Sequence, residues 1–168
     1  MRILGIDPGM RHTGYCLLIT GRPGKHGVID LAGRGKVPIQ DAITAALTGV
    51  RGLVRDLQPD MAVVEQVAWY GRASRITLPL SHVAGAIVGY LLAQGIPVCL
   101  LQASQRVREI PKTWQKWTTE HERDAAALAT ALHRQQRASD AGGASTPRRP
   151  SAVVARIITI PPSAPGRP

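Results

Sequence analysis

Cysteine is scarce in this sequence, with Cys16 and Cys99 the only two among 168 residues. Both lie inside apolar runs, and neither has the further cysteine or histidine partners that a zinc site needs. Such surroundings predict buried free thiols, which are typical of proteins in a reducing compartment. The two cysteines therefore favour neither a disulfide framework nor a zinc centre.

Membrane-spanning and export signals are also missing from the sequence. No apolar run reaches the roughly 20 residues that a transmembrane helix needs. The N-terminal region has no basic segment followed by an apolar one, which is the pattern of a secretory signal. Internal repeats are missing as well. We expect a cytoplasmic protein with no membrane partner.

Acidic residues are outnumbered, since the chain has 11 Asp and Glu against 21 Lys and Arg and a formal net charge of +10. An excess of positive charge this large favours a polyanionic partner, and nucleic acid is the usual one. A generally Arg-rich proteome would produce the same excess, so the charge alone leaves both explanations open. The 44% hydrophobic content and the length predict one globular domain with a single core.

Three runs near the N-terminus predict β-strands, at residues 2–6, 14–20 and 28–37. The first two are apolar, whereas the third is broken by glycines and is typical of an edge strand. Asp7 opens the turn between the first two runs. In that turn we expect Gly9 to supply a backbone conformation that is closed to other residues. Together the three runs predict an antiparallel meander.

Further along, the apolar pattern alternates between strand and helix. Apolar residues recur at three- and four-residue steps in the expected helices, and the expected strands are compact apolar runs. We expect helices at residues 43–57, 80–91 and 121–137, and buried strands at residues 61–67 and 97–101. This order predicts an α/β fold with a five-stranded mixed sheet in the order 3-2-1-4-5, flanked by helices. Ligands of such sheets bind at the C-terminal ends of the central parallel strands.

The composition changes near residue 138. Residues 138–168 are rich in Pro, Gly, Ser, Ala and Arg, which predicts a mostly disordered basic tail after a domain at residues 1–137. Within this tail the run "AVVARIITI" has the composition of a strand and could pair with the sheet.

Three acids and one histidine fall where the predicted topology would bring them together. Asp7 ends the first strand, Glu65 ends the fourth, and the spacing of His121 and Asp124 puts both on one helix face. Carboxylates that converge repel one another unless a cation lies between them. Oxygen-rich clusters suit Mg²⁺ or Mn²⁺, and Mn²⁺ tolerates an imidazole better. Two such ions a few ångströms apart are a known arrangement for phosphodiester hydrolysis.

Each of these residues also has a structural explanation. Asp7 before Pro and Gly is a common turn residue, and a Glu at the end of a strand usually faces solvent. His121 and Asp124 at three-residue spacing occur often by chance, and such matches need structural context. The shared position of all four at one predicted sheet edge favours the functional interpretation.

Three motifs resemble those of a known family. The segments "ILGIDPGMRHTGY", "AVVEQV" and "HERDAAALATALH" are similar to the motifs of the RuvC family of Holliday-junction resolvases, in the ribonuclease H-like superfamily. The third motif matches the variant in which a His and an Asp three residues apart complete the metal site. The resemblance covers roughly residues 1–137. The matching residues of the first two motifs are Asp7, Pro8, Gly9, Arg11, Thr13, Gly14 and Tyr15, then Glu65, Gln66 and Val67.

The resemblance implies a ribonuclease H-like fold and a homodimer that makes paired Mg²⁺-dependent nicks in opposed strands of a four-way DNA junction. It implies that Asp7, Glu65, His121 and Asp124 are the catalytic residues and hold two Mg²⁺ ions, for which Mn²⁺ can substitute. It also includes Arg11 among the residues that contact DNA.

The chain departs from the family pattern at two places. The family's stacking aromatic corresponds to Ala68, although Trp69 and Tyr70 follow directly and offer rings on which a base can stack. Packing of Trp69 in the core is an equal alternative. The basic segment before the last helix is also shorter than in the family.

Basic side chains near the predicted site are candidates for DNA contacts. Lys112 and Lys116 lie in the shortened segment, and neither can be matched to a family lysine. Arg72 and Arg75 follow the glutamate motif, and we expect them to bind the phosphate backbone, which sets affinity rather than sequence choice. Charge runs are otherwise usually solvated surface.

Two other functions fit parts of the sequence. A YqgF-like nuclease that acts on RNA shares the start "RILGIDPGMR", whereas "VVEQV" favours the resolvase. A non-cleaving protein that binds branched DNA would explain the shortened basic segment, but the complete set of four site residues argues against it. An actin-like ATPase would need a longer chain.

Overall fold

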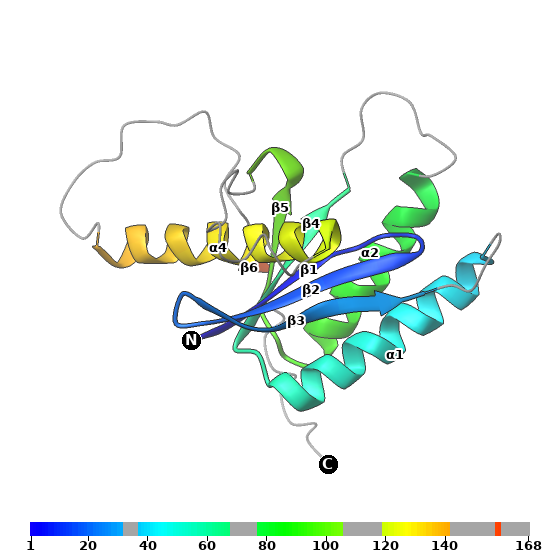
Figure 1. The fold of residues 1–168 in the computed structure, drawn as a ribbon, viewed down its shortest axis with the longest axis horizontal. Coiled ribbons are helices and arrows are strands. Elements are labelled where there is room, and N and C mark those ends of the chain that lie inside the picture. Colours follow the sequence, from blue (N-terminus) through cyan, green and yellow to red (C-terminus); the bar gives the residue numbers. More distant parts are fainter. Residues whose placement is uncertain (32–36, 68–76, 106–118, 142–156, 159–168) are drawn as a thin grey trace, which may run out of the picture.

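The computed structural model describes residues 1–31, 37–67, 77–105, 119–141 and 157–158. It contains a six-stranded sheet in the order β3-β2-β1-β4-β5-β6, with helices against it (Figure 1). The strands are β1 Arg2–Asp7, β2 His12–Ile19, β3 Arg22–Asp30, β4 Met61–Gln66, β5 Val98–Gln102 and β6 Ile157–Ile158. The helices are α1 Ile39–Leu57, α2 Thr77–Ala93 and α4 Glu120–Ala141, and a short 3₁₀ turn, η1, spans Ala103–Gln105.

The pairing of the strands confirms the predicted mixed sheet. β1 pairs antiparallel with β2, and β2 pairs antiparallel with β3, which forms the meander. β1, β4 and β5 are parallel neighbours. The order 3-2-1-4-5 of the five predicted strands is therefore confirmed, and the two-residue β6 extends the sheet beside β5.

The third strand lies earlier in the chain than predicted. β3 spans Arg22–Asp30 rather than residues 28–37, and residues 32–36 lie outside the described part of the chain. Ile19 pairs directly with Arg22, so β2 and β3 form a hairpin with two central residues. These residues, Thr20 and Gly21, both have positive φ (48° and 84°), which is the arrangement of a type I′ turn. The hairpin fixes the register of the edge strand.

The helix ends follow the local sequence. α1 ends at Leu57, where Gln58 adopts a left-handed conformation with φ of 42°. α2 begins at Thr77, so Pro79 lies in its first turn, where the missing N–H costs little. Gly95, with φ of 73°, follows the end of α2.

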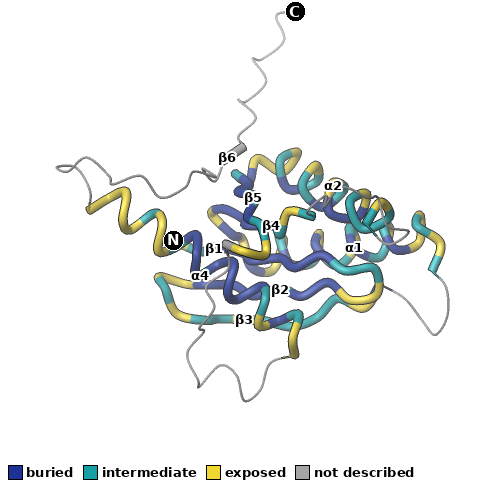
Figure 2. Tube along the Cα trace, turned by 90° about the horizontal axis from the view of Figure 1, so that it is seen from above, coloured by how far each residue is buried: buried dark blue, intermediate teal, exposed yellow. Residues whose placement is uncertain are grey.

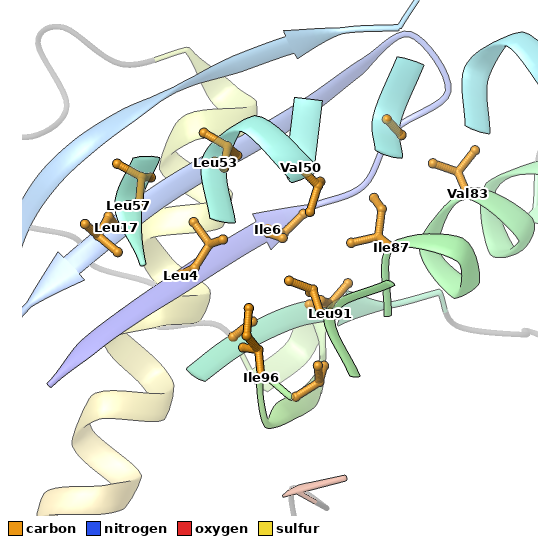
Figure 3. Packing of buried hydrophobic residues seen from close by; sticks show 14 of the residues in the cluster. Leu4, Ile6, Leu17, Val50, Leu53, Leu57, Val83, Ile87, Leu91 and Ile96 are labelled. Atoms are coloured by element: carbon orange, nitrogen blue, oxygen red, sulfur yellow. The ribbon is translucent and has the colours of Figure 1, made fainter. Parts of the chain in front are cut away.

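The sheet is buried on both faces. α1 and α2 cover one face and α4 covers the other (Figure 1; Figure 2). Leu4 and Ile6 of β1 belong to the core cluster under α1 and α2, where Val50 and Ile87 also lie (Figure 3). Ile3 instead packs with leucines of α4. The alternation of side chains along β1 therefore assigns even-numbered residues to the α1–α2 face and odd-numbered residues to the α4 face.

The two thiols are buried, as predicted. Cys16 and Cys99 form no disulfide. Burial raises the pKa of Cys16 to about 12, with a further contribution from the charge of Glu122, and burial raises the pKa of Cys99 to about 11. Both thiols therefore stay protonated and act as small apolar core residues.

Among the described helices, none combines the length and the apolar character that crossing a membrane requires.

The C-terminal segment contributes to the sheet. Val98 and Cys99 of β5 pair with Ile158 and Ile157, within the run "AVVARIITI". α4 also continues to Ala141, past the domain boundary expected at residue 137. The separation into residues 1–137 and a basic tail at residues 138–168 stays a prediction, with β6 as the part that contacts the sheet.

Removing the segment after residue 141 should therefore have two separable effects. Loss of β6 should lower the free energy of unfolding by about 1–2 kcal/mol, the net value of a few backbone hydrogen bonds. Loss of the four arginines in residues 142–168 should weaken, at low salt, the nucleic-acid binding that the net charge predicts, and should flatten its salt dependence. Thermal melts and salt-dependent binding measure these effects.

A chain truncated after residue 158 is the matched control, because it keeps β6. It should melt like the full chain. Equal melting of the 141 and 158 truncations would contradict a structural role for β6.

Candidate active site

Asp7 and Glu65 lie on neighbouring parallel strands at the same edge of the sheet. Ile6 of β1 pairs with Val64 of β4, and both side chains pack in the α1–α2 cluster. Because side chains alternate along a strand, the next residues, Asp7 and Glu65, project toward the α4 face. The structure thus places the two predicted carboxylates side by side on one face.

His121 of α4 contacts Asp7 directly. Its Nδ1 lies 3.0 Å from Asp7 Oδ2, where the imidazole N–H donates to the carboxylate. Asp7 is 8% exposed, whereas the His121 side chain is 41% exposed and faces the solvent edge. Asp124 follows His121 by about one helical turn and is half-buried. Asp7 and His121 are therefore in contact, with Glu65 on β4 beside β1 and Asp124 on the same helix as His121.

The close approach of α4 to the sheet depends on two glycines, Gly5 of β1 and Gly14 of β2, which both face the helix. A Cβ added to Gly14 would overlap the carbonyl oxygen of His121, and one added to Gly5 would overlap the carbonyl oxygen of Ala125. Gly14 pairs with Asp7 across β1 and β2. These glycines let the first turns of α4 lie directly on the strand backbone, which brings His121 to Asp7.

Gly9 is required for a different reason from the one predicted. Among the described residues it is not one of the glycines with positive φ, which are Gly21 and Gly95. A Cβ at Gly9 would instead overlap the carbonyl oxygen of His12. The expected special backbone conformation is thus replaced by a requirement for space in the turn between β1 and β2.

A hydrogen-bond network that the sequence interpretation missed anchors the start of α4. Thr119 and Glu122 form a capping box, in which each backbone N–H donates to the side chain of the other. His26 of β3 donates to Glu122 Oε1 at 2.9 Å. Burial alone would raise the pKa of Glu122, but the hydrogen bonds from Thr119 and His26 outweigh it and lower that pKa. The spacing Thr-x-x-Glu was the available sequence signal, whereas nothing in the sequence indicated His26.

A second pair missed from the sequence lies beside His121. His12 of β2 is paired in register with Asp30 of β3, and its Nδ1 lies 2.8 Å from Asp30 Oδ1. The rings of His12 and His121 have centroids 5.9 Å apart. Four titratable side chains, Asp7, His121, His12 and Asp30, therefore form a row along this edge of the sheet.

A cleft of about 250 Å³ opens at the C-terminal ends of the parallel strands. This is the position where ligands bind in sheets of this kind. Glu65 belongs to its wall, so the cleft adjoins the carboxylate pair. Its lining residues are Pro8, Glu65, Gln66, Val67, Thr77, Leu80 and Ala103.

Most of the predicted DNA contacts lie outside the described residues. This applies to Trp69, Tyr70, Arg72, Arg75, Lys112 and Lys116. Arg11 is described: it is exposed just before β2, and its carbonyl oxygen accepts a hydrogen bond from the N–H of Leu31 at 2.8 Å.

The donor set suits a divalent cation. Asp7 Oδ2 and His121 Nδ1 lie 3.0 Å apart, and both are atoms that could bind a divalent cation. Carboxylates of Asp7 and Glu65 are the hard oxygen donors that such ions prefer. Within the described residues, no three His, Cys, Asp and Glu side chains are yet close enough to hold an ion together. Asp7 and His121 would hold a cation there, with Glu65 and Asp124 as the further candidate ligands.

Comparison with known structures confirms the fold. RuvC of Thermus thermophilus, solved in complex with a Holliday junction substrate, matches with a TM-score of 0.66 at 18% identity, over 82% of this chain and 96% of that one. The yeast mitochondrial Holliday junction resolvase matches with a TM-score of 0.54 at 15% identity, over 81% of this chain and 80% of that one. At these identities the likeness shows the ribonuclease H-like fold alone.

Comparison of the sequence with known proteins bears on the family as well as on the fold. RuvC of Burkholderia vietnamiensis is 38% identical over 117 residues, and RuvC of Burkholderia ambifaria is 37% identical over the same length. The aligned region is 62% of this chain and 58% or 57% of those relatives, so the chain spans less than two thirds of their length. The family model described as crossover junction endodeoxyribonuclease RuvC matches residues 3–110, a range that contains Asp7 and Glu65 and ends before His121. With most of the chain matched and both carboxylates set on adjacent strands of the expected sheet, the chain belongs to the RuvC family.

Proposed function

We propose that this protein is a divalent-metal-dependent DNA endonuclease that nicks branched DNA, with the four-way junction as its substrate. The observation that carries the proposal is the contact between Asp7 and His121 at the C-terminal edge of the sheet, beside Glu65 and an open cleft. Membership of the family supports the reaction class. The chain spans only 58% of the RuvC relative from B. vietnamiensis.

The proposed catalytic residues and metal ligands are Asp7, Glu65, His121 and Asp124. Divalent cations at such a site supply activation of water and stabilisation of the leaving oxygen. Asp7 and Glu65 supply negative charge from neighbouring strands, and α4 carries His121 and Asp124 to the same edge. We propose two Mg²⁺ ions, with Mn²⁺ as a substitute that accepts the imidazole of His121 more readily.

DNA is the proposed partner because of the charge and the cleft. A net charge of +10 favours binding to a phosphate backbone, with affinity that falls as salt rises. A strand bound in the cleft that Glu65 lines would lie next to the carboxylates, which supports the proposal. We propose phosphate contacts from Arg11, Arg72 and Arg75, further contacts from Lys112 and Lys116, and base stacking on Trp69 and Tyr70.

Paired nicks on opposed strands need two active sites, so we propose a homodimer. The location follows from the substrate and from the thiols. Cys16 and Cys99 are buried and form no disulfide, which suits the reducing cytoplasm, and we propose that the protein acts there.

A second candidate function is binding of branched DNA without cleavage. It is favoured by the lack, among described residues, of three ligands already gathered for a metal ion. The RNA nuclease alternative is less favoured, because the matching family model is that of a DNA junction endonuclease.

A nicking assay distinguishes these functions. The substrates are a synthetic four-way DNA junction, a linear duplex of the same arms and an RNA of matching sequence, each with Mg²⁺, Mn²⁺ or EDTA. We expect nicks in the junction with either metal and none with EDTA. Binding of the junction without nicks under every condition would replace the proposal with the non-cleaving function.

A further inference from the structure

Glu122 is a buried carboxylate beside the proposed metal site and outside its ligand set. It is 8% exposed and is among the buried polar residues of the described part of the chain, together with Asp7 and Thr13. Both of its carboxylate oxygens accept hydrogen bonds, Oε1 from His26 and Oε2 from the backbone N–H of Thr119. A buried carboxylate with both oxygens satisfied is held in one orientation.

The contact with His26 distinguishes this arrangement from an ordinary helix cap. A capping box joins residues three apart and serves the helix end without any further partner. His26, however, lies on the edge strand β3, 96 residues away in sequence. The Glu122–His26 hydrogen bond therefore joins the first turn of α4 to the sheet. Its function is to fix where the helix begins relative to the strands.

His121 and Asp124 are the side chains that this anchor positions. His121 precedes Glu122 directly and reaches Asp7 on β1, whereas Glu122 reaches β3 on the other side of the same turn. Gly14 lies beneath His121, so the turn is also in contact with β2. The first turn of α4 is thus held at three neighbouring strands, through two hydrogen bonds and one backbone contact.

We propose that Glu122, held by Thr119 and His26, is a positioning residue that keeps His121 and Asp124 directed toward the divalent-cation site beside Asp7. The identity of that site rests on the proposed function, whereas the anchoring of α4 does not. Glu122 binds no metal ion itself. Its loss should let His121 and Asp124 move, while both of these proposed ligands remain present.

The test compares Glu122→Ala, Glu122→Gln and Glu120→Ala in the full chain. Glu120 is exposed in the same helical turn, so Glu120→Ala removes the same charge without touching the network. Calorimetry measures Mn²⁺ binding to the DNA-free protein, and amide hydrogen exchange of residues 123–126 measures the order of the first turns of α4. Junction nicking is followed on the same preparations.

We expect Glu122→Ala to weaken Mn²⁺ binding by about ten-fold or more, as loss of a residue that orients metal ligands does. Exchange at residues 123–126 should become faster in this variant. Gln fits the same capping position, so Glu122→Gln should restore most of both properties. Glu120→Ala should stay within about two-fold of wild type, as surface changes do.

Unchanged Mn²⁺ affinity and exchange in folded Glu122→Ala would overturn the proposal. If that variant fails to fold, His26→Ala, which removes the donor to Glu122, is measured in the same way, and wild-type behaviour of His26→Ala would overturn the proposal equally. If the wild-type protein binds no Mn²⁺ without DNA, the Mn²⁺ concentration that gives half-maximal nicking of the junction is compared in its place. Mn²⁺ binding by a wild-type protein that never nicks DNA would remove the proposed nuclease function and leave the positioning role of Glu122 in place.

Discussion

Replacing Asp7 with Asn should reduce nicking of a four-way DNA junction by about a thousand-fold or more, equivalent to roughly 4 kcal/mol of transition-state stabilisation. The change keeps the shape of the side chain but removes the charge that would bind a cation. It also removes negative charge facing the phosphates, so junction binding should be intact or tighter. Single-turnover nicking and gel-shift binding on the same preparation measure the two effects.

Asp140→Asn is the matched control for this change. Asp140 is exposed on α4, and 16 residues separate it from Asp124, or about 24 Å along the helix axis. The control loses the same charge and should nick like wild type. Undiminished nicking by Asp7→Asn would remove Asp7 from catalysis, and an equal loss in both variants would assign the effect to net charge.

The strand order and the carboxylate pair could be predicted because they depend on local patterns. Compact apolar runs identify the strands, apolar residues at three- and four-residue steps identify the helices, and short connections leave few ways to arrange them. Asp7 and Glu65 each follow a buried strand, so parallel pairing of those strands places both at one edge. The position of His121 and Asp124 on one helix face follows from helix geometry in the same way.

The position of the third strand along the chain could not be predicted with the same rules. The hairpin turn is formed by Thr20 and Gly21, and Thr is an unusual residue for a position with positive φ. Without that turn, glycines in the run Arg22–Asp30 read as loop residues. The strand was therefore placed too late, at residues 28–37.

Contacts between elements that are distant in the sequence could not be predicted either. His26 meets Glu122, and His12 lies against His121, only because the meander and α4 pack on the same face. Polar residues at these positions are equally typical of exposed strands. The interpretation of Gly9 failed for a related reason, since its constraint is a neighbouring carbonyl group rather than its own φ.

Gly14→Ala should have the second large effect, because glycine at this position leaves room for the backbone of α4. The new methyl group would overlap the carbonyl oxygen of His121, which belongs to the helix backbone and cannot rotate away. Overpacking of this kind costs about 1–3 kcal/mol of stability. Displacement of α4 by a fraction of an ångström to 1 Å should also reduce nicking by about 100-fold, because the proposed ligand His121 moves away from Asp7. Thermal melts and single-turnover nicking measure the two losses.

Gly85→Ala in α2 is the matched control, since a Cβ there meets no atom within 4 Å. Alanine is the better helix former, so this variant should gain about 1 kcal/mol while nicking normally. The same Gly-to-Ala change is therefore expected to act in opposite directions at the two positions. A Gly14→Ala protein that melts and nicks like wild type would show that α4 can shift without consequence. It would then follow that the contact between His121 and Asp7 does not set the activity.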